Sequence, residues 1–220
     1  MKVAVVVGLR AEARLARRLG LAVVTGGGTA SGAEAAARRA IEAGATALVS
    51  FGLAGGLDPT LRPGALIVPT AVLCDDVAHA ADPALVAWLG GATPHRLLAA
   101  ATIATDAAAK RRLWLETGAA AVDLESGAVA RVAKAHGLPF AVLRAICDPA
   151  ERDLPPAALV ALDASGAIGL ARVAGSVAAR PGQIPALLRL AADAAAARRA
   201  LARRVTSVRQ LSLNIIRRAP

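Results

Sequence analysis

The chain has 220 residues, of which 56% are hydrophobic and 19% charged, so it can bury a full core as one domain and is not a disordered polymer. Its net charge is +10, but residues 180–220 hold nine arginines and one acid, which leaves only 17 − 15 = +2 for residues 1–179. Two Phe, two Trp and no Tyr provide few stacking surfaces, so we expect no nucleic-acid partner. Two cysteines, Cys74 and Cys147, predict neither a disulfide framework nor a metal site.

No apolar run is long enough to cross a bilayer without interruption by charge, proline or glycine. The first apolar run stops at Gly8, too early for a secretory signal core, so we expect a cytoplasmic protein.

The first half of the chain alternates short apolar runs with helical segments. Residues 2–7 predict a buried parallel strand, followed by a helix over 11–19 and a strand over 21–25. Gly26–Gly28 come next, and Thr29 or Ser31 begins a helix that ends near residue 43. A strand over 47–51 leads into Gly52–Gly56, which we expect to form a glycine-rich loop, and another strand covers 65–72.

The second half continues this alternation. A strand over 97–103 precedes a helix that begins near Asp106, and a strand over 120–124 delivers Glu125 to a helix ending at Gly137. The last strand, 138–146, ends at Asp148-Pro149. Repeated strand–helix alternation predicts a single three-layer α/β domain, with a mostly parallel, mixed central sheet flanked by helices.

Polar side chains follow several of these strands, where ligands bind in such sheets. Glu12 follows the first strand, Asp123 and Glu125 follow a later one, and Arg144 and Asp148 come at the end of the last. Carboxylates around one mouth suit acid–base work on a substrate that develops positive charge. Each residue alone also fits a structural role, such as a turn cap or a first-turn helical acid.

Three segments carry a family resemblance. VVVGLRAEA, FGLAGGLDPTLRPGALIVP and AVDLESGAVARVAKAHGLPFAVLRAICD resemble the purine nucleoside phosphorylase and methylthioadenosine/S-adenosylhomocysteine nucleosidase superfamily over residues 1–150. DPAERDLPPAALVAL and RPGQIPALLR are similar to the hopanoid-associated phosphorylases within it, which extends the resemblance to about residue 205.

The resemblance implies roles for the residues around the scissile bond. Asp148 matches the aspartate that helps protonate purine N7, and Glu125 matches the glutamate that holds the ribose 2′-hydroxyl. Leu124 matches an apolar residue placed against the sugar. Breaking an N-glycosidic bond needs a proton for the leaving base, an anion beside the sugar cation and a nucleophile, so no cofactor is expected.

The same resemblance implies that Ala104, Thr105 and Asp106 line the purine. Glu12 matches the glutamate that activates water in the nucleosidases, and Arg144 an arginine that supports this region.

The nucleophile stays open at this point. The expected nucleophile or phosphate loop comprises Gly26, Gly27, Gly28, Gly52, Leu53, Ala54 and Gly55. Phosphorylases hold phosphate with arginines and a serine, whereas Glu12, Ser50 and Leu53 stand at the nearest places here. The resemblance to phosphorylases suggests phosphate as the nucleophile, but the Glu12 carboxylate would repel it. Water is therefore kept as a candidate beside phosphate.

The subgroup resemblance implies cleavage of adenosylhopane to adenine and a ribosyl- or phosphoribosyl-hopane in hopanoid side-chain biosynthesis. The superfamily resemblance implies a homo-oligomer, a dimer or larger. One alternative is a methylthioadenosine/S-adenosylhomocysteine nucleosidase, and another is a non-catalytic nucleoside- or lipid-binding protein.

We divide the chain into a catalytic domain, residues 1–182, and a basic helical tail, residues 183–220. The tail has apolar residues at helical spacing (Ile184, Leu187, Leu188, Ala191 and Ala195) and five arginines between 189 and 204. It fits either a helix packed on the domain or a contact with anionic lipid at the inner membrane surface.

Overall fold

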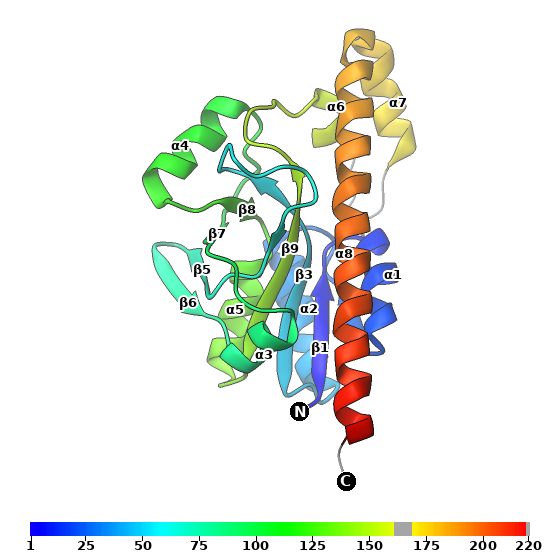
Figure 1. The fold of residues 1–220 in the computed structure, drawn as a ribbon. Helices are drawn as coiled ribbons and strands as arrows, with labels where there is room; N and C mark the ends of the chain where they lie inside the picture. The colour runs from blue at the N-terminus through cyan, green and yellow to red at the C-terminus, as the bar shows by residue number, and fades with distance from the viewer. Residues whose placement is uncertain (161–168, 219–220) are drawn as a thin grey trace.

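The computed structural model describes the backbone of residues 1–160 and 169–218, and the side chains of these residues up to residue 210. The last ten residues of the predicted tail, 211–220, therefore lie outside the described side chains. A central sheet is covered by helices on both faces, and one long helix runs along the side of the molecule (Figure 1).

The described residues form one nine-stranded sheet. Its order is β2 (Ala22–Thr25), β1 (Val3–Val7), β3 (Ala47–Gly56), β8 (Ala121–Asp123), β7 (Leu97–Ala99), β5 (Ala71–Cys74) and β6 (Val77–Ala80). β9 (Phe140–Asp148) pairs with β3 and with β4 (Leu66–Ile67). The pairs β1–β2, β1–β3, β3–β9, β5–β7 and β7–β8 are parallel, and β3–β8, β4–β9 and β5–β6 are antiparallel.

Helices pack against each face of this sheet. α2 (Ala30–Glu42) and α5 (Ser126–Ala135) cover one face, where small alanines such as Ala36 and Ala133 allow close approach to Leu48 and Val142. α1 (Arg10–Ala16), α3 (Pro83–Trp88) and α8 (Ile184–Arg218) cover the other. The predicted three-layer α/β domain with a mixed, mostly parallel sheet is confirmed.

The remaining helices lie at the end of the sheet where β9 finishes. They are α4 (Ala107–Thr117), α6 (Pro156–Leu159), α7 (Leu170–Ala179) and η2 (Pro181–Gln183), whereas η1 (Arg17–Leu19) continues α1 and lies just before the start of β2. α6, α7 and the first turns of α8 project beyond the strands (Figure 1).

Three details correct the prediction. Gly52–Gly56, expected to form a loop, belongs to strand β3 instead. Glycine is needed here because neighbouring side chains pack closely against the strand, and not because the chain turns. The strand predicted over 65–72 is divided into β4 and β5 on either side of Pro69, whose missing N–H cannot join a ladder. α3 was not predicted; Asp82 caps it by accepting the Leu85 N–H at 2.9 Å.

α8 joins the domain over the part that faces the sheet. Ala197, Leu201 and Val205 are buried in the same core cluster as strand residues of β1, β3 and β9. Ile184 and Leu188, on the apolar face expected from the sequence, are exposed instead. The part of α8 that packs on the sheet therefore begins after these residues, and the sequence left open whether the apolar face packs on the domain or contacts lipid.

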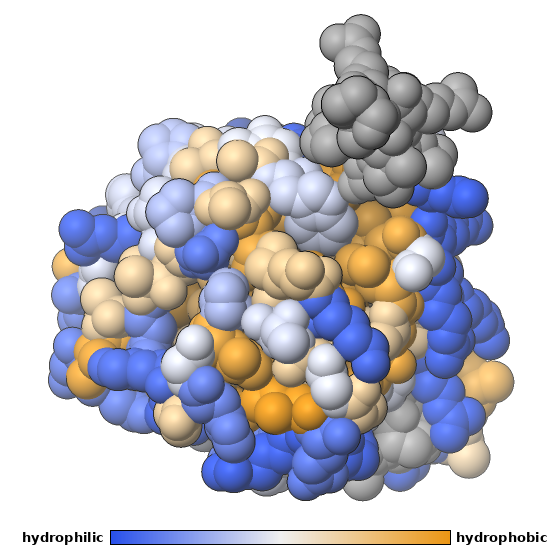
Figure 2. All heavy atoms as spheres, turned by 90° about the horizontal axis from the view of Figure 1, so that it is seen from below, coloured by the Kyte–Doolittle hydropathy of each residue, from blue (hydrophilic) through white to orange (hydrophobic). Residues whose placement is uncertain are grey.

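Figure 2 shows the molecule from below, at the end opposite to α6 and α7. Hydrophilic residues make up much of its rim, and apolar residues gather near the middle of the view. Among the described residues, no helix combines the length and apolar character needed to cross a membrane.

Candidate active site

Glu12 is held at the carboxyl end of β1, in the first turn of α1. Its Oε2 accepts the Gly8 N–H at 3.1 Å and the Leu9 N–H at 2.8 Å, which closes the start of the helix. Its Oε1 accepts the Leu53 N–H from β3 at 2.8 Å. Burial raises the pKa of Glu12, while Arg144 and these three amides partly oppose the rise.

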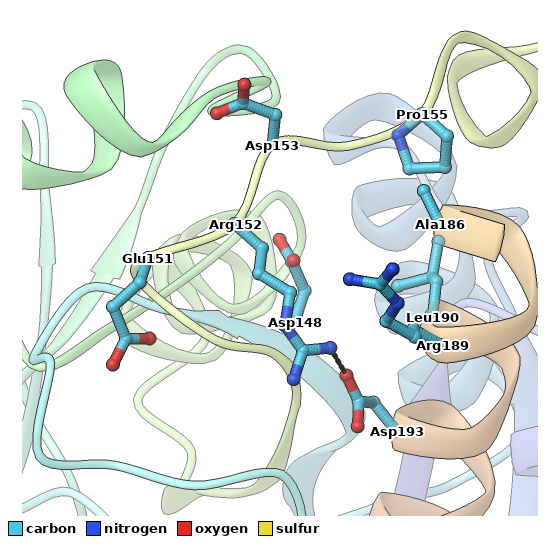
Figure 3. A pocket seen from close by; sticks show the side chains of 9 residues that line it. All are labelled: Asp148, Glu151, Arg152, Asp153, Pro155, Ala186, Arg189, Leu190 and Asp193. Atoms are coloured by element: carbon cyan, nitrogen blue, oxygen red, sulfur yellow. Dashed lines mark hydrogen bonds and ion pairs between the residues drawn. The ribbon is translucent and has the colours of Figure 1, made fainter. Parts of the chain in front are cut away.

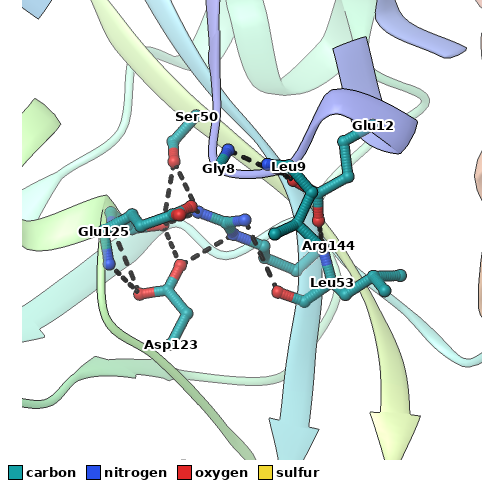
Figure 4. Close-up of polar contacts among 9 residues, drawn as sticks. Gly8, Leu9, Glu12, Ser50, Leu53, Asp123, Glu125 and Arg144 are labelled. Carbon is teal, nitrogen blue, oxygen red and sulfur yellow. Dashed lines mark hydrogen bonds and ion pairs between the residues drawn. The ribbon is translucent and has the colours of Figure 1, made fainter. Parts of the chain in front are cut away.

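Arg144, on β9, is the centre of the polar cluster drawn in Figure 4. Only 1% of this residue is exposed. Its Nε lies 2.7 Å from Asp123 Oδ2, and its Nη2 lies 3.0 Å from Glu125 Oε2. Burial opposes the charge on the guanidinium, but the surrounding carboxylates outweigh it and raise the pKa of Arg144.

Two serines complete the cluster. Arg144 Nη2 donates to Ser50 Oγ at 2.8 Å, the Ser126 hydroxyl donates to Asp123, and the two serine Oγ atoms lie 3.1 Å apart. Asp123 Oδ1 also accepts the Ser126 N–H at 3.2 Å, so this aspartate caps the start of α5. Every one of these polar groups is thus fixed by a neighbour.

Glu125 stands at the start of α5, facing Gly8 at the end of β1. A Cβ at Gly8 would overlap the Glu125 carboxylate, so only glycine lets this side chain reach the cluster. Burial raises the pKa of Glu125 to about 7; Arg144 opposes this change, and Glu12 and Asp123 add to it. Glu125 therefore exchanges a proton near neutral pH.

Asp148 lies at the end of β9 with a different cation. Lys110, on α4, is 1% exposed, and its Nζ lies 2.5 Å from Asp148 Oδ2. The same Nζ donates to Pro149 O at 3.0 Å and Arg152 O at 2.7 Å. Burial raises the pKa of Asp148 more strongly than its hydrogen bond and ion pair with Lys110 lower it.

A cavity of about 280 Å³ opens beside Asp148 (Figure 3). Its lining residues come from the segment after β9 and from α8: Asp148, Glu151, Arg152, Asp153, Pro155, Ala186, Arg189, Leu190 and Asp193. An ion pair between Arg152 and Asp193 joins the two walls. The cavity therefore combines apolar and charged groups at the end of the sheet.

The structure brings Glu12, Glu125 and Arg144 together as predicted, but Glu125 does not line the cavity beside Asp148. The pairing of β3 with β9 shifts register here: Ala54 faces Ile146 and Gly55 faces Asp148, so Cys147 is an extra residue. Such an irregularity changes the direction of the side chain that follows it. Arg144 and Asp148 consequently serve neighbouring sites.

The two glycine segments, residues 26–28 and 52–55, have structural roles that the sequence did not predict. Gly26 N–H donates to Val7 O at 2.7 Å and Gly27 N–H to Gly8 O at 3.1 Å, so these two amides are engaged by the backbone. A Cβ at Gly52 would collide with Arg144 and Glu12. Gly52, Leu53, Ala54 and Gly55 form strand β3 rather than the predicted nucleophile loop, with Gly55 opposite Asp148.

The segment expected to line the purine lies near the cavity wall. Thr105 O accepts the Leu154 N–H at 2.8 Å, and Ala104 is buried. The Asp106 side chain accepts the Ala109 N–H at 2.8 Å and caps α4. Leu124 is half-buried beside Glu125.

Sequence reasoning missed Lys110 and Ser126. Lysine is rare in this arginine-rich chain, with three lysines against 23 arginines, and that rarity is the signal that could have drawn attention to Lys110. Cys147 borders Asp148, but burial raises the pKa of its thiol to about 12, so it is not a thiolate at neutral pH. In the part of the chain that the structure describes, no group of three or more His, Cys, Asp or Glu is arranged to hold a metal ion.

A family model described as "Phosphorylase superfamily" matches residues 12–178. No curated protein matches the chain.

Solved structures of similar fold include several nucleosidases. A methylthioadenosine/S-adenosylhomocysteine nucleosidase from Colwellia psychrerythraea, in complex with adenine, is 20% identical with a TM-score of 0.62, covering 69% of this chain and 84% of that one. An S-adenosylhomocysteine nucleosidase from Streptococcus pyogenes is 19% identical with a TM-score of 0.62, covering 69% and 85%. A futalosine hydrolase mutant from Helicobacter pylori is 17% identical with a TM-score of 0.65, covering 81% of this chain and 99% of that one.

Proposed function

Because the chain belongs to the phosphorylase superfamily, we propose that it cleaves the N-glycosidic bond of a 5′-substituted adenosine, with water as the nucleophile. The predicted resemblance is confirmed at the level of this superfamily, and so is the prediction of an enzyme. Beyond the superfamily, the proposal names water as the nucleophile and a 5′-substituted adenosine as the substrate.

The observation that carries the proposal is the buried Glu12–Arg144–Glu125 cluster, which lies at the carboxyl ends of β1 and β8 and beside the middle of β9. An anionic Glu125 beside the sugar favours the oxocarbenium ion that forms as the N9–C1′ bond breaks. Glu12, whose pKa is raised by burial, accepts a proton from water as the water oxygen bonds to C1′. The electron pair of the broken bond leaves with the purine, and Asp148 supplies the proton at N7.

The charge of the cluster favours water over phosphate. Three carboxylates, Glu12, Asp123 and Glu125, surround the single guanidinium of Arg144. Phosphate would bring further negative charge into this buried site, and at about 4 Å like charges repel by roughly 4 kcal/mol with an effective dielectric constant near 20. The amides of Gly26 and Gly27 are already bonded to the backbone, so they do not compensate.

The 5′ substituent we propose is a hopane, as the resemblance of the segments after Asp148 implies. Three of the nine residues that line the cavity, Pro155, Ala186 and Leu190, offer apolar surface to this substituent, and the other six are charged. The similar nucleosidase folds support the alternative substrate, methylthioadenosine or S-adenosylhomocysteine. A non-catalytic binding protein has no need of a proton donor, whereas burial raises the pKa of Asp148, the group that supplies the proton in this mechanism.

The test is an adenine-release assay with adenosylhopane and with methylthioadenosine, each with and without phosphate. We expect adenine release that does not require phosphate, and a free ribosyl product by mass spectrometry. Glu12→Gln should reduce release by roughly 100-fold or more, as loss of a general base does. Glu34→Gln, which alters a glutamate paired with Arg38 on the surface of α2, is the matched control and should keep the wild-type rate. A phosphorylated sugar product, or a wild-type rate in Glu12→Gln, would contradict the proposal.

A further inference from the structure

The segment between β9 and the packed part of α8 forms a projecting unit, which we call the α6–α7–α8 lobe (residues 154–160 and 169–192). Gln183 ties it together: its Oε1 accepts the Ala157 N–H at 2.8 Å, and its Nε2 donates to Ser176 O at 2.8 Å. Arg172 Nε donates to Val160 O at 2.9 Å, which joins α7 to the end of α6. The lobe is therefore a built structure, and it stands beyond the end of the sheet (Figure 1).

Large apolar side chains are concentrated on the outside of this lobe. Nine such side chains are exposed in the described part of the chain, and five belong to the lobe: Leu159, Val160, Leu170, Ile184 and Leu188. Leu170 is 76% exposed and Leu188 is 66% exposed. Leaving leucine in water is unfavourable, so such a concentration indicates a surface that is covered in use.

The charges of the lobe have one sign. Arg172, Arg180 and Arg189 are exposed on it, and its described residues include no aspartate or glutamate. The one acid in the sequence between 154 and 192 is Asp163, which lies outside the described residues. Leucines interspersed with arginines match the interface of an anionic bilayer, where the leucines enter the acyl boundary and each arginine meets lipid headgroups.

A second copy of the chain fits this surface less well. In a twofold-symmetric contact the same patch lies on both sides, so two surfaces of the same positive charge would meet, and the described residues of the lobe itself include no acid to pair with its arginines. We propose that the α6–α7–α8 lobe docks on the surface of an anionic lipid bilayer.

The α6–α7–α8 lobe adjoins the cavity beside Asp148, so docking would bring the cavity close to the bilayer; this step rests on the proposed function. Pro155, Ala186 and Leu190 line the cavity beside Asp148 and belong to the same lobe whose outer residues carry the exposed leucines. A nucleoside with an apolar 5′ substituent would therefore pass from the bilayer to the cavity along one continuous element of the structure.

The test is co-sedimentation of the full chain with vesicles of phosphatidylcholine alone, or of phosphatidylcholine and phosphatidylglycerol in equal parts. We expect the wild type to pellet with the anionic vesicles only. The double variant Leu170→Glu/Leu188→Glu should bind them about tenfold more weakly or worse, since each leucine loses apolar insertion and adds a repelled charge. Leu115→Glu, on α4 at 68% exposure, is the matched control and should bind like the wild type.

Several results would overturn the docking proposal. These are absence of wild-type pelleting, equal loss in the control and the lobe variant, or a lobe variant that changes only the oligomeric mass in sedimentation analysis. Loss confined to Arg199→Glu/Arg203→Glu would instead assign the contact to the basic side of α8. Release of adenine from water-soluble methylthioadenosine, measured without vesicles, should be unchanged in the lobe variant. Vesicle binding without any adenine release would refute the proposed function and leave the docking intact.

Discussion

Glu125→Gln replaces a carboxylate that lies buried among Arg144, Glu12 and Asp123 with a neutral amide of nearly the same shape. The rise in the pKa of Glu125 from 4.5 to about 7 corresponds to about 3 kcal/mol, because one pKa unit equals about 1.36 kcal/mol. Since the folded state binds this proton more tightly than the unfolded state, the stabilisation is present below about pH 4.5 and is lost as pH rises through about 7. Glutamine has no such proton to lose.

The variant should therefore gain stability relative to the wild type as pH rises. Between pH 4.5 and 8 the difference in the free energy of unfolding should move by about 3 kcal/mol in favour of Glu125→Gln. Urea unfolding followed by the fluorescence of Trp88 and Trp114 measures it at each pH, and adenine release at neutral pH should fall sharply. A stability difference that is the same at pH 5 and pH 8 would refute the burial argument, whatever happens to activity.

Three further changes probe separate parts of the structure. Lys110→Met leaves Asp148 buried without its cation and should lower the free energy of unfolding by about 3–5 kcal/mol in urea titrations; a change below 1 kcal/mol would contradict the pairing. Gly8→Ala should abolish adenine release because its Cβ overlaps a carboxylate, whereas Gly175→Ala, which meets nothing within 4 Å, should keep the wild-type rate. Leu201→Ala should cost about 2–5 kcal/mol of unfolding free energy if α8 completes the core, and a cost near zero would show that α8 does not.

The sheet was predictable where strands are buried on both faces. β1 is a continuous apolar run, and β9 is apolar apart from Arg144 and Asp148, because helices cover both sides of a parallel strand and no alternation is needed. α3 and β6 escaped prediction because they are short elements stabilised by their position in the fold rather than by a strong local pattern. The glycines of β3 were wrongly predicted to form a loop. Glycine is required both in tight turns and where side chains pack closely against a strand, so the residue type alone does not distinguish the two.

The candidate site was predictable to the extent that strand ends determine it. Glu12 and Glu125 follow different strands, yet both carboxyl ends lie beside Arg144, as the sheet rule implies. The position of Asp148 depends on a register shift at Cys147, and its partner Lys110 comes from a helix whose packing no local pattern determines. The positions of strand ends in the sequence thus predict which residues gather at the carboxyl end of the sheet. They do not predict which of these residues pair with the same cation.

That division of counter-ions matters for the proposed chemistry. Arg144 balances the anions of one cluster, while Lys110 balances Asp148 alone, although Arg144 and Asp148 lie on the same strand. Cleavage needs an anion beside the sugar at the same moment as a proton on the leaving base, so the two carboxyl groups must hold opposite protonation states. Separate cations allow each carboxyl group to be tuned by its own surroundings. The register shift in β9 therefore supports the mechanism by dividing one strand end into two electrostatic environments.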